Sequence, residues 1–144
     1  MTPRILATAF AVSLALPGWA QDTPAPEGAM VYFVNLEDGA TVTSPVTVIF
    51  GLSGMGVAPA GTEKENTGHH HLLIDRPAFG SEDPEELDFG IPADDNHVHF
   101  GGGQTETTLD LPPGEHTLQL VLGDLNHVVH ATPVASDVIT IIVE

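Results

Sequence analysis

Short runs of alternating hydrophobic and polar residues follow one another along most of the chain, with turn residues between them. In one such run Val46, Val48 and Phe50 occupy every second position, so they share one face of a strand. By this pattern we predict strands over residues 30–35, 45–52, 69–75, 97–100, 104–111, 115–122 and 137–143. No stretch after residue 30 has the period of an amphipathic helix.

About seven short strands with turns between them predict an all-β fold, an immunoglobulin-like antiparallel β-sandwich. The turn Pro112-Pro113-Gly114 precedes a leucine-alternating strand, which fits the start of the sixth strand of such a fold. A closed β-barrel would use the same strands, and the pattern does not distinguish it from the sandwich.

The N-terminal residues have the features of a secretory signal peptide. Arg4 lies in a short positive region, and Ile5–Leu16 is an apolar stretch followed by a helix breaker and small residues. This stretch is about a dozen residues long, too short to cross a bilayer. We expect residues 1–20 to be cleaved, residues 21–29 to form a flexible leader, and residues 30–144 to form one domain. The protein would then be periplasmic or secreted, with no membrane span after signal cleavage.

The expected mature chain is strongly acidic. After loss of Arg4, Lys64 and Arg76 are its only strong cations against 20 acidic residues. Such a surface repels nucleic acid and anionic lipid and attracts cations, although adaptation to a salty habitat explains the acidity equally well. The chain has no cysteine, which excludes disulfides and a blue-copper centre. With Met30 and Met55 as the only mature methionines, a sulfur-rich copper(I) site is not expected.

All eight histidines lie between residues 69 and 130. In the first histidine-bearing strand, alternation with the core-facing Leu72 places His69 and His71 on the outer face. The same parity places His97 and His99 on the outer face of the next strand. If these strands are neighbours, opposed imidazoles are about 5 Å apart, close enough to turn toward one ion.

A second group of histidines is expected to join the first. In an immunoglobulin-like sandwich the start of the third strand and the loop before the last strand lie at the same end, and that loop carries His127 and His130. Imidazole suits copper, zinc and nickel, and Asp75 and Asp124 are candidate carboxylate ligands. We therefore predict a copper or zinc site. Its candidate ligands are His69, His71, His127, His130, His97 and His99.

For other polar residues, structural explanations compete with functional ones. Histidine triplets also occur as ordinary strand residues, and for His70 a structural role and a ligand role are equally compatible. His116 is in phase with the inward-facing leucines, so we expect it to hold a strand end by hydrogen bonds. The acidic insertion over residues 76–96 would suit calcium but lacks the spacing of an EF-hand loop. We expect a solvated lid there, which would gate the histidine face.

Several stretches of the chain resemble one bacterial family of secreted domains, known as domain of unknown function 4399. They are Gly68–Asp75, His97–Thr105, Pro112–Leu120, and Gly123-Asp124 with His127 and His130. The chain is similar to this family over roughly residues 50–144. The resemblance implies a signal-bearing extracytoplasmic protein with a compact β-domain. The family has no established activity, so the resemblance implies no mechanism.

Two functions fit these observations best. One is a metal-binding module that buffers or delivers copper or zinc. The other is a non-catalytic module of the cell envelope whose histidine face binds another protein without a metal. A glycan suits that face less well, because aromatic residues are few. A pH-responsive domain is a third alternative, since imidazoles become charged as the pH falls. No nucleophile lies beside a base in a recognisable motif, so no enzymatic activity is predicted.

Overall fold

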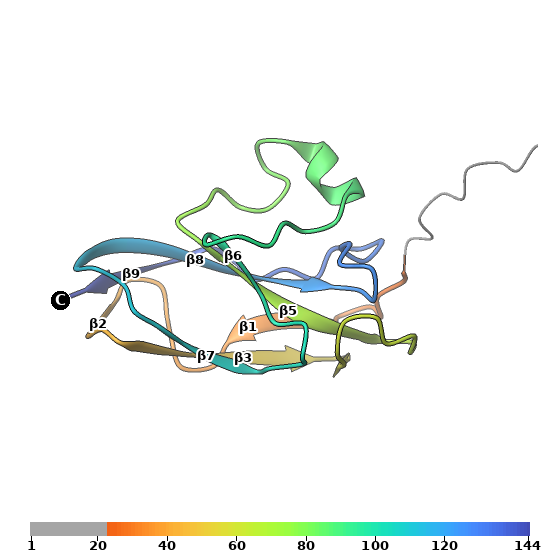
Figure 1. The fold of residues 1–144 in the computed structure, drawn as a ribbon, viewed down its shortest axis with the longest axis horizontal. Helices are drawn as coiled ribbons and strands as arrows, with labels where there is room; N and C mark the ends of the chain where they lie inside the picture. The colour runs from red at the N-terminus through yellow and green to blue at the C-terminus, as the bar shows by residue number, and fades with distance from the viewer. Residues whose placement is uncertain (1–22) are drawn as a thin grey trace, which may run out of the picture.

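The structure is a computed structural model that describes residues 23–144. Its strands form two sheets, one with the order β1-β3-β7 and a larger one with the order β2-β9-β8-β5-β4, in which β6 also pairs with β5 (Figure 1). The strands are β1 (Met30–Phe33), β2 (Ala40–Val42), β3 (Val46–Ser53), β4 (Gly56–Val57), β5 (Thr67–Ile74), β6 (His97–His99), β7 (Glu106–Leu109), β8 (Gly114–Gly123) and β9 (Ile139–Val143). The predicted signal peptide and the first two leader residues lie outside the described residues.

The main hydrophobic core lies between the two sheets. Val48 and Phe50 of β3 face Leu72 of β5, Leu120 of β8 and Ile141 of β9, and all five side chains are buried. These residues occupy alternate positions of their strands, because successive side chains of a strand point to opposite sides of a sheet. The predicted all-β sandwich is therefore confirmed.

Two short strands are additional to the predicted ones. The three residues of β2 pair in parallel with β9, and the two residues of β4 pair in parallel with the start of β5. Segments of two or three residues are too short to show a repeated alternation, so the sequence pattern does not reveal them. Their pairing depends on neighbours that are distant in the sequence. The strand pairs at these two edges of the larger sheet are parallel, and the other strand pairs are antiparallel.

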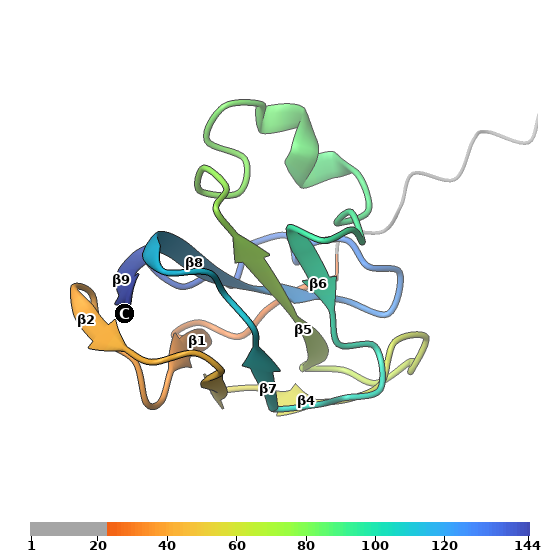
Figure 2. The same cartoon turned by 60° about the vertical axis from the view of Figure 1, so that its left-hand side comes forward.

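A second, smaller core covers the outer face of the larger sheet. Leu73 of β5 and Val121 of β8 pack against Ile91 of the acidic insertion and Val129 of the loop after β8. Figure 2 shows the insertion standing over β5 and β6, on the side away from the smaller sheet. The outer face of the larger sheet, where the histidines were predicted to lie, is therefore partly covered by two loops.

The insertion contains the one helix of the described residues, the 3₁₀ helix η1 (Pro84–Asp88). Asp83 caps it by accepting a hydrogen bond from the backbone N–H of Glu85, and Pro84 stands at its first position. Between residues 23 and 144 we find no helix with the length and apolar character needed to cross a membrane.

Candidate metal centre

Three adjacent strands bring the first histidines together. His71 of β5 lies directly opposite His99 of β6, and on its other side β5 pairs with β8 so that His69 lies opposite Gly123. His69 and His71 share the face of β5 that points away from the main core. Their parity is as predicted from the alternation, and the pairing of β5 with β6, on which the expected convergence depended, is present.

The imidazole nitrogens of these three residues form a compact group. Nε2 of His71 lies 3.0 Å from Nε2 of His69. His69, His71 and His99 each offer one nitrogen within 4.8 Å of the others. Two nitrogens bound at about 2.0–2.1 Å to one tetrahedral zinc ion are about 3.3 Å apart, so small rotations of the rings would allow all three to reach one ion.

His127 joins the group from the loop after β8. Its ring centroid lies 4.7 Å from that of His99, 5.0 Å from that of His69 and 6.2 Å from that of His71. Its backbone has a φ of 67°, in the left-handed region that few residues other than glycine adopt. His127 is therefore a neighbour of the three strand histidines, held by a special backbone conformation.

Asp124 shapes the turn that carries His127. Its carboxylate accepts hydrogen bonds from the backbone N–H of Asn126 and of Val128, at 2.8 and 3.1 Å, and from the hydroxyl of Thr23. Its backbone N–H donates to the carbonyl of Val128, and its carbonyl accepts from the N–H of His127. Asp124 was a candidate ligand, but its side chain is used to build this turn.

Two glycines leave room for the rings. A Cβ atom at Gly123 would lie 2.8 Å from Nε2 of His71 and 3.4 Å from Nε2 of His69. A Cβ atom at Gly101 would lie 2.7 Å from Nε2 of His99. Both distances below 3 Å are too short for a side chain, so only glycine fits beside these nitrogens.

The cluster is buried on one side and more open on the other. His69 is 1% exposed and His71 0%, whereas His99 and His127 are partly exposed. Burial, and then the neighbouring imidazoles of His127 and His99, lowers the pKa of His69 to about 4. Burial, and then the imidazoles of His69 and His99, lowers the pKa of His71 to about 3. Burial also lowers the pKa of His99. At neutral pH these rings are uncharged and have lone pairs available to a cation.

Two nitrogens at the cluster have no hydrogen-bond partner in the part of the chain that is described. They are Nδ1 of His71 and Nε2 of His99, and both are buried. Buried polar atoms are almost always hydrogen-bonded, because an unpaired one costs roughly 1–3 kcal/mol. A cluster of neutral imidazoles with orphaned nitrogens fits a bound cation.

The structure does not bring His97 and His130 into the cluster. Nδ1 of His97 is hydrogen-bonded to the carboxylate of Asp94, at 2.9 and 3.0 Å from its two oxygens. Nε2 of His130 lies 3.3 Å from the carbonyl oxygen of Thr67. His97 lies on the same strand as His99, and His130 lies in the same loop as His127. Their rings nevertheless make other contacts and do not join the cluster.

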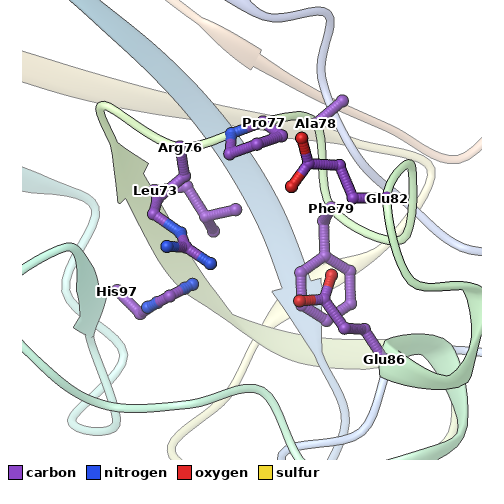
Figure 3. Close-up of a pocket in the computed structure, with 8 residues that line it drawn as sticks. All are labelled: Leu73, Arg76, Pro77, Ala78, Phe79, Glu82, Glu86 and His97. Carbon is purple, nitrogen blue, oxygen red and sulfur yellow. The ribbon is translucent and has the colours of Figure 1, made fainter.

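His97 lines a small cavity beneath the insertion instead. This cavity has a volume of about 10 Å³, and its other lining residues include Leu73, Arg76, Phe79 and Glu86 (Figure 3). In Figure 3 the guanidinium of Arg76 extends toward the ring of His97. His97 thus contacts Asp94 and this cavity rather than the other imidazoles.

The remaining histidines have structural environments. Nδ1 of His116 lies 2.9 Å from the carboxylate of Asp75, and its Nε2 lies 2.9 Å from the carbonyl oxygen of Pro112. The predicted role of His116 in holding a strand end is confirmed, and Asp75 is committed to it rather than to a metal. His70 points into the main core and packs against Phe50, with ring centroids 5.2 Å apart. It therefore lies on the opposite side of β5 from the cluster.

Sequence reasoning missed the parts of the site that are not ligands. Gly101 and Gly123 were not predicted to belong to the site, although a glycine in a strand often marks a place where other atoms approach closely. The second core was missed because the insertion has no periodicity to reveal which side chains point inward.

Comparison with known proteins gives one result. The model of a family described as a domain of unknown function (DUF4399) matches residues 48–144, which include every histidine of the chain. The resemblance seen in the sequence is thus confirmed. No curated protein and no solved structure matches the chain.

Proposed function

Because this chain belongs to the DUF4399 family, whose name states no activity, we propose a function from the site alone. The protein is a histidine-based metal-binding domain that takes up copper(II) or zinc and acts as a buffer or a carrier of that metal. His69, His71 and His99 hold the ion, and His127 lies beside it.

One observation carries the proposal: three neutral imidazoles from two paired strands place nitrogens within 4.8 Å of one another. The convergence of the rings distinguishes this site, since buried nitrogens without a partner also occur on His70 and His130, outside the cluster. A cation bound within this group of nitrogens would also give Nε2 of His99 a partner.

The ligand set favours borderline metals over hard ones. Imidazole nitrogen binds copper(II) and zinc well, whereas calcium and magnesium prefer oxygen. The carboxylate of Asp124, in the turn that carries His127, is engaged by backbone N–H groups. Met55 packs against the main core and Met30 lies on β1, so neither methionine adds sulfur to the group.

The proposed location is the periplasm or the exterior of the cell. It is supported by the signal-peptide pattern over residues 1–20 and by the acidity of the chain, with its formal net charge of −17. A negative surface raises the local concentration of cations, which suits a protein that collects them.

Metal analysis of the purified protein tests the proposal. The protein is stripped with a chelator, dialysed against copper(II) or zinc, and its bound metal is counted. We expect one ion per chain, and we expect a stabilisation of about 2.7 kcal/mol when free metal is 100 times the dissociation constant. Calcium at the same concentration is the control and should give neither effect. Binding of fewer than one copper or zinc ion per two chains would contradict the proposal.

A further inference from the structure

We propose that a metal ion held by His69, His71 and His99 keeps one coordination position open on the side of His127, and that this position binds a small anion. The inference rests on the proposed function and extends it from metal storage to ligand binding at the metal. The observations that carry it are the number of ligands, the direction of the opening and the charge of the site.

The ligand count leaves the coordination incomplete. Among the described residues, the group of histidine and carboxylate ligands that lie within 4.8 Å of one another contains three members. Zinc sites with three protein ligands generally keep a fourth position for water or a substrate, whereas closed structural sites have four protein ligands. Three imidazoles therefore specify an open site.

The exposure of the four rings indicates the side on which the open coordination position lies. His69 and His71 are buried, and a Cβ atom at Gly123 would lie within 3.4 Å of both of their Nε2 atoms, so there is little space on that side. His99 and His127 are partly exposed and lie next to each other, with ring centroids 4.7 Å apart. We therefore place the open position on the side of these two rings.

The charge of the site favours an anion. Three neutral imidazoles leave both positive charges of a divalent ion uncompensated in a largely buried place. The carboxylate of Asp124 neutralises part of this charge at best, because its oxygens accept hydrogen bonds from the turn. A small anion bound to the ion would neutralise a further charge, and the neighbouring ring of His127 supplies an N–H as a hydrogen-bond donor on that side.

Azide is a suitable probe, because its binding to copper(II) produces a charge-transfer absorption band. The copper-loaded protein is titrated with azide, and the metal-free protein is titrated as a blank. We expect a saturable band with one azide per copper. A copper-loaded protein without such a band would overturn the inference while leaving the proposed function intact, and a protein that takes up no copper would overturn both.

Two variants of the same loop sharpen the test. His127→Ala should keep its copper and bind azide roughly tenfold more weakly, the loss expected for one hydrogen bond to a charged group. Asn126→Ala, at the exposed neighbouring position, should bind azide as the unchanged protein does. If azide bound only to the His127→Ala protein, His127 would be a fourth ligand that closes the site, and the open position would be disproved.

Discussion

His71 of β5 and His99 of β6 are directly opposed in the sheet, and their ring centroids lie 5.0 Å apart. Ligands on paired strands are held by the backbone hydrogen bonds of the sheet. Such side chains move less than side chains on loops, so the proposed metal site would be pre-organised. The position of His127, by contrast, depends on the single turn that Asp124 stabilises.

Replacement of His69 and His71 together by alanine should abolish metal uptake while the sandwich stays folded. The two side chains supply two of the three clustered nitrogens. We expect a loss of affinity greater than the 10–100-fold that is typical when a residue hydrogen-bonded to a ligand is removed. Bound copper or zinc per chain, measured after dialysis, checks this, and circular dichroism checks the fold.

His97→Ala is the matched control for this double variant. His97 lies on the same face of its strand as His99 but is paired with Asp94. It should retain metal with unchanged affinity. A strong loss of metal in this variant, or none in the double variant, would mean that the ligands are assigned incorrectly.

Gly123→Ala should weaken metal binding without removing any ligand. The added methyl group would lie 2.8 Å from Nε2 of His71, so this ring must turn away. We expect roughly tenfold to hundredfold lower affinity, the range found when support of a ligand is lost. Competition with a chromophoric chelator measures it. Gly56→Ala is the control, since its new methyl group would lie 3.6 Å from Cγ2 of Thr67, at ordinary contact distance, and unchanged affinity is expected there.

The metal-free protein should lose stability as the pH falls below neutral. The pKa of His69 is about 4 and that of His71 about 3 in the folded state, against an ordinary value of 6.5. Between pH 6.5 and about 4 the unfolded chain therefore binds protons that the folded chain does not, so the free energy of unfolding decreases as the pH falls. The slope is at most about 1.4 kcal/mol per pH unit for each histidine.

Urea denaturation at several pH values across this window measures the slope. The double alanine variant of His69 and His71 should show a flatter dependence, because both groups are absent. Equal slopes in the two proteins would show that these histidines do not stay neutral in the folded state.

Asp75→Asn should destabilise the protein more at mildly acidic pH than at alkaline pH. The hydrogen bond to Asp75, together with that to the Pro112 carbonyl, raises the pKa of His116 above 6.5. This pair therefore adds stability that is complete below pH 6.5 and is lost as the pH rises through the folded value. Because Asp75 is partly exposed, we expect a cost of only about 1 kcal/mol near pH 6 and less near pH 9.

Asparagine is a conservative choice at this position. Asp75 has a φ of 55°, which asparagine tolerates, and an amide oxygen can still accept the hydrogen bond from the N–H of Thr117. Denaturation at the two pH values measures the difference. The same cost at both would show that the charge of Asp75 contributes nothing to the pair.

The face of the sheet on which the strand histidines lie could be predicted from the sequence, whereas the positions of the loop histidines could not. Alternation with Leu72 was enough to place His69 and His71 on one face, because the period of a strand is fixed by its backbone. His127 and His130 lie three residues apart in one loop, where no such period exists. Which of them reaches the cluster is decided by the turn that Asp124 builds.

The same limit applies to His97 and His99. Both lie on the correct face of β6, but His97 is opposite Leu73, whereas His99 is opposite His71. Parity assigns a face, while the register between two strands assigns a neighbour. Register is set by contacts along the whole strand and by Asp94, which hydrogen-bonds to His97.

The sequence by itself determined the β-sandwich and the side of the strand on which the histidines of β5 and β6 lie. These properties follow from alternation, which is local and repeats every two residues. Only the tertiary structure decided which imidazoles meet, that two loops bury them, and that Gly101 and Gly123 leave them space. Such properties depend on strand register and turn geometry, which arise from contacts between residues that are far apart in the chain.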